Sequence, residues 1–133
     1  MKKIGLTLVL IATFPAWSQS VLSSDGFQTP SGNIMCLYSG GSLRCDISQT
    51  TNRPPPKPKD CPVDWGNAFE LPPKGGAKRL CYGDTIMGNY PTLAYGAKWS
   101  KNGLICESEK TGLTCSNQSS NGFSLSKAQQ RFF

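Results

Sequence analysis

The stretch "CLYSGGSLRC", residues 36–45, places two cysteines at equal distances from a Gly-Gly step. Gly-Gly suits a two-residue hairpin turn, because glycine adopts positive φ at both central positions without strain. Counting outward from that turn sets Cys36 opposite Cys45 in a non-hydrogen-bonded pair, where Cα atoms lie about 4.5 Å apart. A disulfide can bridge that distance. The stretch therefore predicts a β-hairpin closed by its own disulfide.

The same register gives the hairpin a core face and an outer face, because successive side chains of a strand point to opposite sides. The predicted core face is apolar: Ile34, Cys36, Tyr38, Leu43, Cys45 and Ile47. The mixed outer face carries Met35, Leu37, Arg44 and Asp46. We therefore expect the disulfide on the core side of the hairpin.

A second stretch, "CESEKTGLTC" at residues 106–115, repeats the spacing at an offset of 70. It predicts a second hairpin and suggests an internal duplication. A turn centred on Lys110-Thr111 keeps Cys106 opposite Cys115, whereas a three-residue loop ending in Gly112 shifts the register by one. The sequence leaves both turns open.

Six cysteines allow 15 pairings, but two locally closed hairpins leave Cys61 and Cys81 for each other. The alternative is a crossed, knotted framework. An even number of cysteines in a small exported protein is typical of a disulfide scaffold.

The first residues have the pattern of a secretory signal peptide. A charged "MKK" precedes an apolar run from Ile4 to Phe14, and "AWS" at residues 16–18 is a small-x-small cleavage site. The apolar run is too short to span a bilayer. We expect residues 1–18 to be a signal peptide and residues 19–133 to be a single domain without a membrane span, secreted or periplasmic.

Basic residues gather in the middle of the chain, although loss of Lys2 and Lys3 lowers the formal charge from +6 to +4. The densest group is Lys57, Lys59, Lys74, Lys78 and Arg79. Such a group could bind an anionic envelope glycan or protein, and solvated loop charges are the simpler interpretation. The export signal, the modest charge and the lack of a nucleic-acid-binding motif argue against nucleic acid as a partner.

The remaining segments predict a mostly β fold. Four prolines between Thr51 and Cys61 favour an extended connector. Strands are predicted over Asn67–Leu71, Lys78–Tyr82 and Thr92–Ser100. Ser126 with Gln129 resembles a capping box and predicts a short C-terminal helical turn. The expected fold is a small disulfide-stapled antiparallel sheet, sandwich or barrel with two Cys-x8-Cys hairpins.

Catalytic motifs are scarce in this sequence. The chain has no histidine, which excludes Ser-His-Asp and Cys-His nucleophile systems and most zinc sites, and we expect no metal and no cofactor. The fragments Ser124–Lys127 (S-x-x-K) and Lys110–Gly112 (K-T-G) imitate a penicilloyl-serine site, but their order is reversed and no S-D-N is present. A local structural role, in a turn or a cap, explains both fragments better than a catalytic site does.

Paired carboxylates are the remaining catalytic option, with Asp64 and Asp84 as the candidate pair of a small hydrolase acting on carbohydrate. Both lie in turn-like contexts, where an aspartate usually bonds its own backbone. Among the aromatic residues, Tyr90 precedes a proline and is the ring expected to be most exposed.

The order of motifs is also familiar: "FQTPSGNIMC", "LRCDI", "CPVDWG", "CYGDT", "LAYG", "GLICES", "GLTCSN" and "GFSLSKAQQRF". From about Phe27 to Phe132 the chain resembles a family of small exported bacterial domains, domain of unknown function 6636. The resemblance implies an exported, cysteine-rich, mostly β domain, and it implies no activity, cofactor or catalytic residue.

Taken together, the sequence favours a non-enzymatic binding module of the cell envelope or secreted space. The loops expected to bind are Pro54–Asp60, Lys74–Arg79 and Gly88–Tyr95, which combine charge with ring surface. A small carbohydrate-active hydrolase and a purely structural envelope component are the alternatives.

Overall fold

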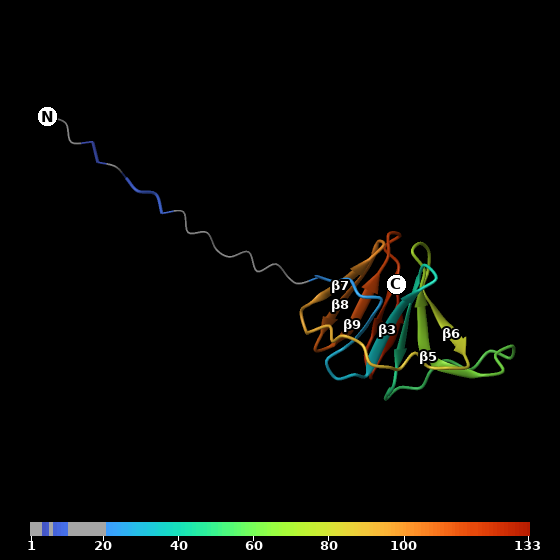
Figure 1. The fold of residues 1–133 in the computed structure, drawn as a ribbon. Helices are drawn as coiled ribbons and strands as arrows, with labels where there is room; N and C mark the ends of the chain where they lie inside the picture. Colours follow the sequence, from blue (N-terminus) through green and yellow to red (C-terminus); the bar gives the residue numbers. More distant parts are fainter. Residues whose placement is uncertain (1–3, 6, 11–20) are drawn as a thin grey trace.

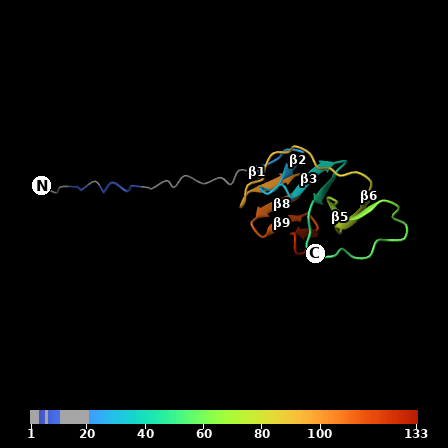
Figure 2. The same ribbon diagram turned by 90° about the horizontal axis from the view of Figure 1, so that it is seen from below.

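The structure is a computed structural model that describes residues 4–5, 7–10 and 21–133. The described residues form two β-sheets and no helix, so no helix among them is long and apolar enough to cross a membrane. Figure 1 shows the two sheets packed against each other, and Figure 2 shows the same arrangement from below. The predicted cleavage site after Ser18 lies outside the described residues.

One sheet has five strands, all antiparallel to their neighbours. In spatial order they are β2 (Gly26–Gln28), β3 (Ile34–Ser39), β4 (Ser42–Ile47), β5 (Asp64–Leu71) and β6 (Lys78–Tyr82). The other sheet has six strands, antiparallel except for the β1–β7 pair. They are β1 (Val21–Leu22), β7 (Lys98–Lys101), β8 (Leu104–Glu109), β9 (Gly112–Ser116), β10 (Gly122–Leu125) and β11 (Gln130–Phe132).

Both Cys-x8-Cys stretches form the predicted hairpins. Cys36 pairs with Cys45 across β3 and β4 and Cys106 pairs with Cys115 across β8 and β9, each with its Cα atoms 4.1 Å apart and a disulfide between them. Glu109 lies opposite Gly112, so the second turn is the two-residue Lys110-Thr111 alternative. The third disulfide joins Cys61 to Cys81, which is the predicted pairing.

The core lies between the two sheets, with one hairpin on each side. The four hairpin cysteines are fully buried in it. Trp99 packs on Phe27 with the ring centres 5.3 Å apart, and Phe69 packs on Phe123 at 6.1 Å. The sheets therefore form a sandwich, and in the described part of the chain they do not close into a barrel.

The predicted C-terminal helical turn is wrong. Ser126 Oγ accepts a hydrogen bond from the amide of Gln129, as a capping serine would, but residues 126–129 are the tight turn between β10 and β11. A helix of so few residues is unstable by itself, whereas pairing with β10 satisfies the backbone of the last residues. Phe132 then packs against Phe69, with ring centres 6.0 Å apart.

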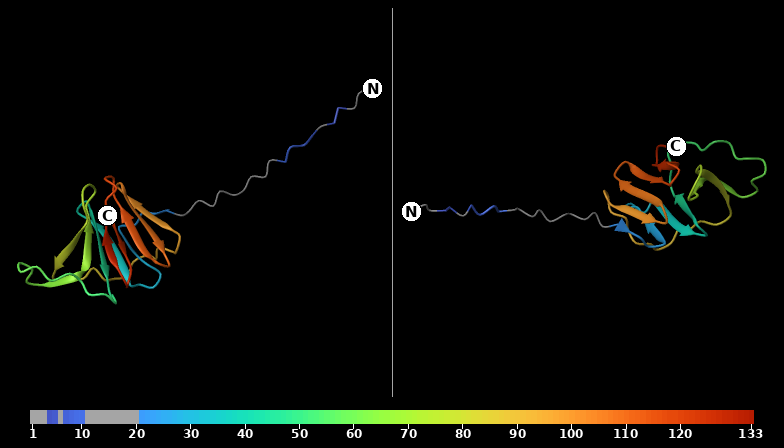
Figure 3. Two further views of the ribbon diagram at one scale, coloured as in Figure 1. Left: turned by 180° about the vertical axis from the view of Figure 1, so that it is seen from behind. Right: turned by 90° about the horizontal axis from the view of Figure 1, so that it is seen from above.

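The segment between β6 and β7 is a long loop that crosses from one sheet to the other. The strand predicted over Thr92–Ser100 forms only at its end, where β7 begins at Lys98. Thr92 makes one isolated parallel bridge with Gln28. Figure 3 shows this loop leaving the end of β6 and running to the other sheet, and β6 itself is only partly covered.

Limited reduction of the folded protein should open the Cys61–Cys81 bridge first. Cys81 is exposed, whereas the four hairpin cysteines are fully buried, and a reductant must reach a sulfur atom to act. The measurement is a titration with a phosphine reductant under native conditions, followed by alkylation and mass spectrometry. In denaturant all three bridges should be reduced together, and equal labelling of the hairpin cysteines in the native protein would contradict the prediction.

Candidate functional site

The basic residues that are close in the sequence are separated by strand β5. Lys57 and Lys59 lie in the loop before the start of β5, and Lys74 and Lys78 lie near its other end. An eight-residue strand spans about 26 Å at about 3.3 Å per residue. All four lysines are exposed, and Lys78 pairs with Glu70 across β5 and β6. The structure therefore does not gather them into one patch.

Arg79 stabilises the β5–β6 hairpin through its side chain. Its Nη1 donates a hydrogen bond of 2.8 Å to the carbonyl of Gly66, and its guanidinium carbon lies 4.9 Å from the centre of the Phe69 ring. The register of β5 is irregular between Trp65 and Phe69, and the guanidinium lies beside that irregularity. Burial lowers the pKa of Arg79 from its ordinary value. Its contacts are those of a structural residue.

Tyr90 is half-buried. Its hydroxyl donates to the carbonyl of Ile86 over 2.6 Å, and a Cβ added to Gly26 would collide with its ring. The open ring of the same loop belongs to Tyr95, which is 48% exposed. Of the two tyrosines, Tyr95 therefore offers more surface to a ligand.

The candidate carboxylates Asp64 and Asp84 lie at the same end of the β5–β6 hairpin. Asp64 pairs with Tyr82, two residues before Asp84. Both aspartates are exposed, and the contact that Asp84 makes is through its carbonyl, which accepts a 2.7 Å hydrogen bond from Arg44. An acid catalyst of a glycosidase works in a partly enclosed, apolar setting that these positions do not provide.

Asp46 is a buried charge that the alternation pattern did not reveal, because the pattern places it on the outer face. Its carboxylate accepts hydrogen bonds from Arg44 Nε at 2.9 Å, Arg44 Nη2 at 3.1 Å, Thr85 Oγ1 at 3.2 Å and the amide of Ile86 at 3.1 Å. The loop after β6 covers this face and supplies two of these donors. Asp46 therefore holds that loop against the sheet.

Tyr82 lies beside this network. The guanidinium carbon of Arg44 is 5.4 Å from the centre of its ring. Burial raises the pKa of Tyr82, the charges of Asp64 and Asp46 raise it further, and Arg44 acts in the opposite direction. Ionisation of the Tyr82 hydroxyl is therefore less favourable than that of a free tyrosine.

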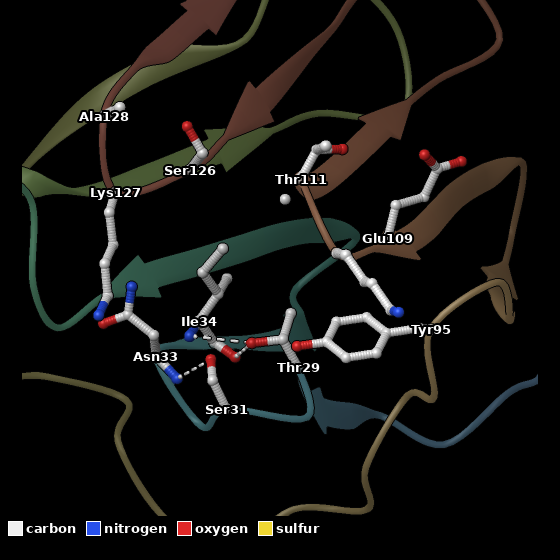
Figure 4. A pocket seen from close by; sticks show the side chains of 12 residues that line it. Thr29, Ser31, Asn33, Ile34, Tyr95, Glu109, Thr111, Ser126, Lys127 and Ala128 are labelled. Atoms are coloured by element: carbon white, nitrogen blue, oxygen red, sulfur yellow. Dashed lines mark hydrogen bonds between the residues drawn. The ribbon is translucent and has the colours of Figure 1, made fainter.

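A hollow opens at one end of the sandwich, and we call it the end pocket (Figure 4). Its volume is about 460 Å³. Its walls come from the loop before β3, the loop before β7, the β8–β9 turn and the β10–β11 turn. The lining residues are Thr29, Ser31, Asn33, Ile34, Tyr95, Glu109, Lys110, Thr111, Gly112, Ser126, Lys127 and Ala128.

The end pocket combines an apolar base with a charged rim. Ile34 is buried, and in Figure 4 Tyr95 points toward Thr29 while Lys127 reaches toward Asn33. Lys110 and Lys127 come from two different turns, and both are exposed. With Glu109 as the acidic neighbour, the rim carries a net positive charge.

The tertiary structure brings residues of the K-T-G and S-x-x-K fragments to this one pocket. Both fragments contribute residues to hairpin turns there. Ser126 Oγ donates to the carbonyl of Gln129 at 3.1 Å and accepts from its amide at 3.2 Å. Thr29 Oγ1 is likewise engaged, at 3.3 Å from the amide of Ile34. These hydroxyls are held by the backbone, and neither is placed beside a base as a nucleophile requires.

The chain matches the model of a family of unknown function, DUF6636, over residues 6–133. The chain belongs to this family. The match covers nearly the whole sequence and includes part of the N-terminal apolar segment. No curated protein and no solved structure matches the chain. Family membership thus supports the resemblance read from the motifs and assigns no activity.

The two Cys-x8-Cys hairpins differ at the position two residues after the first cysteine. Tyr38 packs 6.4 Å from Trp99 between ring centres, and its hydroxyl accepts a 2.8 Å hydrogen bond from Asn102. The residue at the offset of 70 is Ser108, which is fully buried and whose hydroxyl has no hydrogen-bond partner among the described residues. The second hairpin therefore has a serine in place of the tyrosine, and this serine directly precedes Glu109, which lines the end pocket.

At the opposite end, Asn117 links the two sheets. Its amide nitrogen donates to the carbonyls of Pro72 and Gly75, each at 2.8 Å, and its amide oxygen accepts from the backbone of Ser119 and Asn121 at 3.0 and 3.1 Å. The first pair belongs to the β5–β6 turn and the second to the β9–β10 turn. The sequence shows only a polar loop at Asn117, so this link between the sheets could not be predicted from it.

The residues that the structure describes contain no cluster of three or more potential metal ligands.

Replacement of Asn117 by Ala should lower the free energy of unfolding by about 2–3 kcal/mol, because Asn117 is 8% exposed and all its polar capacity is used. Denaturant unfolding followed by tryptophan fluorescence measures the change. The control is Asn89→Ala at an exposed loop position, which should change stability by less than about 0.5 kcal/mol. Equal effects of the two substitutions would contradict the structural role of Asn117.

Proposed function

We propose that this chain is an exported, non-enzymatic binding module of the cell envelope or secreted space. Export rests on the predicted signal peptide over residues 1–18 and on the three disulfides, which persist in oxidising compartments. A periplasmic or secreted location follows from both. The family membership is compatible with this function and adds no substrate to it.

The observation that carries the proposal is the end pocket on a cross-linked frame. Its walls are two hairpin turns and two loops, and one of those turns closes the disulfide-bridged β8–β9 hairpin. Loops held on a rigid scaffold are the usual place for a binding site. A volume of about 460 Å³ falls within the range of about 300–1,000 Å³ that small-molecule sites occupy.

Binding fits the chemistry of this pocket better than turnover. The hydroxyls of Ser126 and Thr29 are bonded to the backbone, and the chain has no histidine to activate a nucleophile. The exposed pair Asp64 and Asp84, which a carbohydrate-active hydrolase would use, is not among the residues that line the pocket. The pocket therefore supports a ligand that is held and released unchanged.

Capture experiments test this function. The oxidised chain without residues 1–18 is immobilised, envelope and secreted material is passed over it, and retained molecules are identified by mass spectrometry and sugar analysis. We expect Ala128→Phe, which fills the end pocket from an exposed turn position, to abolish specific retention. The double variant Lys57→Gln/Lys59→Gln, on the proline-rich loop, should retain the same material.

The opposite pattern would overturn the assignment. If Ala128→Phe keeps its retained material and the Lys57/Lys59 variant loses it, the proline-rich loop is the binding surface and the pocket is not. Circular dichroism and an intact disulfide map for each variant exclude loss of fold as the cause.

A further inference from the structure

The surface of the end pocket is mostly apolar, and the ammonium groups of two lysines lie at its rim. We propose that its ligand is an acidic saccharide, a sugar unit that carries a carboxylate; this rests on the proposed binding function. Lys110 and Lys127 contribute ammonium groups, which donate three hydrogen bonds each and accept none. A carboxylate is the complementary partner for such groups.

The two lysines are free to bind. The ion pairs within the described residues are Arg44 with Asp46 and Lys101 with Asp25, so neither pocket lysine is engaged in one. Lys110 belongs to the two-residue turn between β8 and β9 and Lys127 to the turn of residues 126–129 between β10 and β11, so the flanking strands hold both backbone positions. Lys127 is fixed further, because its carbonyl accepts a 2.8 Å hydrogen bond from the amide of Thr51. The positive charges of Lys110 and Lys127 thus come from two different hairpin turns and border the same pocket.

The polar groups around the lysines add donors. Ser31 Oγ accepts from the amide of Asn33 at 3.2 Å, which leaves its hydroxyl hydrogen for a ligand. The side chain of Asn33 is committed to Gln49, with both its nitrogen and its oxygen bonded to that backbone. Thr111 is exposed on the rim. Glu109 is the one acidic side chain among the lining residues, and the two lysines outnumber it, so the remaining polar groups favour a ligand with oxygen acceptors, such as a sugar acid.

An aromatic and apolar surface completes the match to a sugar ring. The ring of Tyr95 is 48% exposed and borders the hollow, and Ile34 forms its buried base. Aromatic faces pack on the C–H face of a pyranose, while its hydroxyls meet the polar rim. An acidic peptide would satisfy the lysines but would leave this flat surface less well used. The saccharide is therefore the ligand that uses all three features.

The test is a titration of the oxidised chain, without residues 1–18, followed by heteronuclear NMR. The probes are digalacturonate, the neutral disaccharide galactobiose and an oligoglutamate peptide. We expect digalacturonate to shift the amide signals of Tyr95, Thr111 and Lys127 and to bind at least about tenfold more tightly than galactobiose. Binding should weaken as salt is added, since exposed charges are screened.

Matched variants separate charge in the pocket from charge in general. Lys110→Gln and Lys127→Gln should each weaken digalacturonate binding by about two- to fivefold, the range of an exposed ion pair. The control Lys57→Gln/Lys59→Gln removes two positive charges from the distant proline-rich loop, one more than either pocket variant, and it should leave the affinity unchanged. Tyr95→Ala should weaken both disaccharides.

Three results would overturn the inference. Equal binding of galactobiose and digalacturonate would remove the acidic class and leave a saccharide-binding module. Pocket shifts with oligoglutamate alone would replace the saccharide by an acidic peptide and leave the binding function. If no probe shifts the pocket signals and Ala128→Phe also leaves envelope capture unchanged, the proposed function fails together with the ligand class.

Discussion

Burial of two hairpin disulfides in one core is the constraint on which the rest of the structure depends. Cys36 with Cys45 and Cys106 with Cys115 lie fully buried on facing sheets, so each bridge fixes a strand register and also fills core volume. A slip of one residue would turn every core side chain of a hairpin toward solvent. A core this small gains most from such bridges, since each also restricts the unfolded chain.

Polar side chains, rather than further apolar packing, hold the long loops onto this frame. Asp46 secures the loop after β6 through two hydrogen bonds, from Thr85 and Ile86, and is itself bound by Arg44. Asn117 joins the two turns at the other end through four hydrogen bonds. Buried polar groups are tolerated when every donor and acceptor has a partner. Loops fixed in this way can line a site with little loss of entropy on binding.

The two Cys-x8-Cys hairpins contribute different side chains to the two ends of the sandwich. Tyr38 packs against Trp99 at one end of the sandwich, whereas the equivalent residue of the second hairpin, Ser108, is a small buried side chain next to Glu109, which lines the end pocket. Turn residues are free to vary because the disulfides, and not the turns, maintain the register. The lysines at the rim can therefore serve binding without a cost to the fold.

The sequence by itself determined the hairpins, their turns to within one alternative and the β6 strand, because each depends on residues within a few positions of one another. The Cys61–Cys81 pairing followed only by elimination, with a crossed framework as the alternative, and the structure decided it. The helical turn predicted around Ser126 is wrong, because the same capping pattern also fits a hairpin turn. Pairing of β11 with β10 in the folded chain selects the hairpin turn. Among the predicted binding residues, the lysines lie near the two opposite ends of β5, and Arg79 stabilises the β5–β6 hairpin. Only the tertiary structure decided the pocket, since its walls come from residues 29–34, 95, 109–112 and 126–128, and packing of two sheets, not local spacing, brings those segments together.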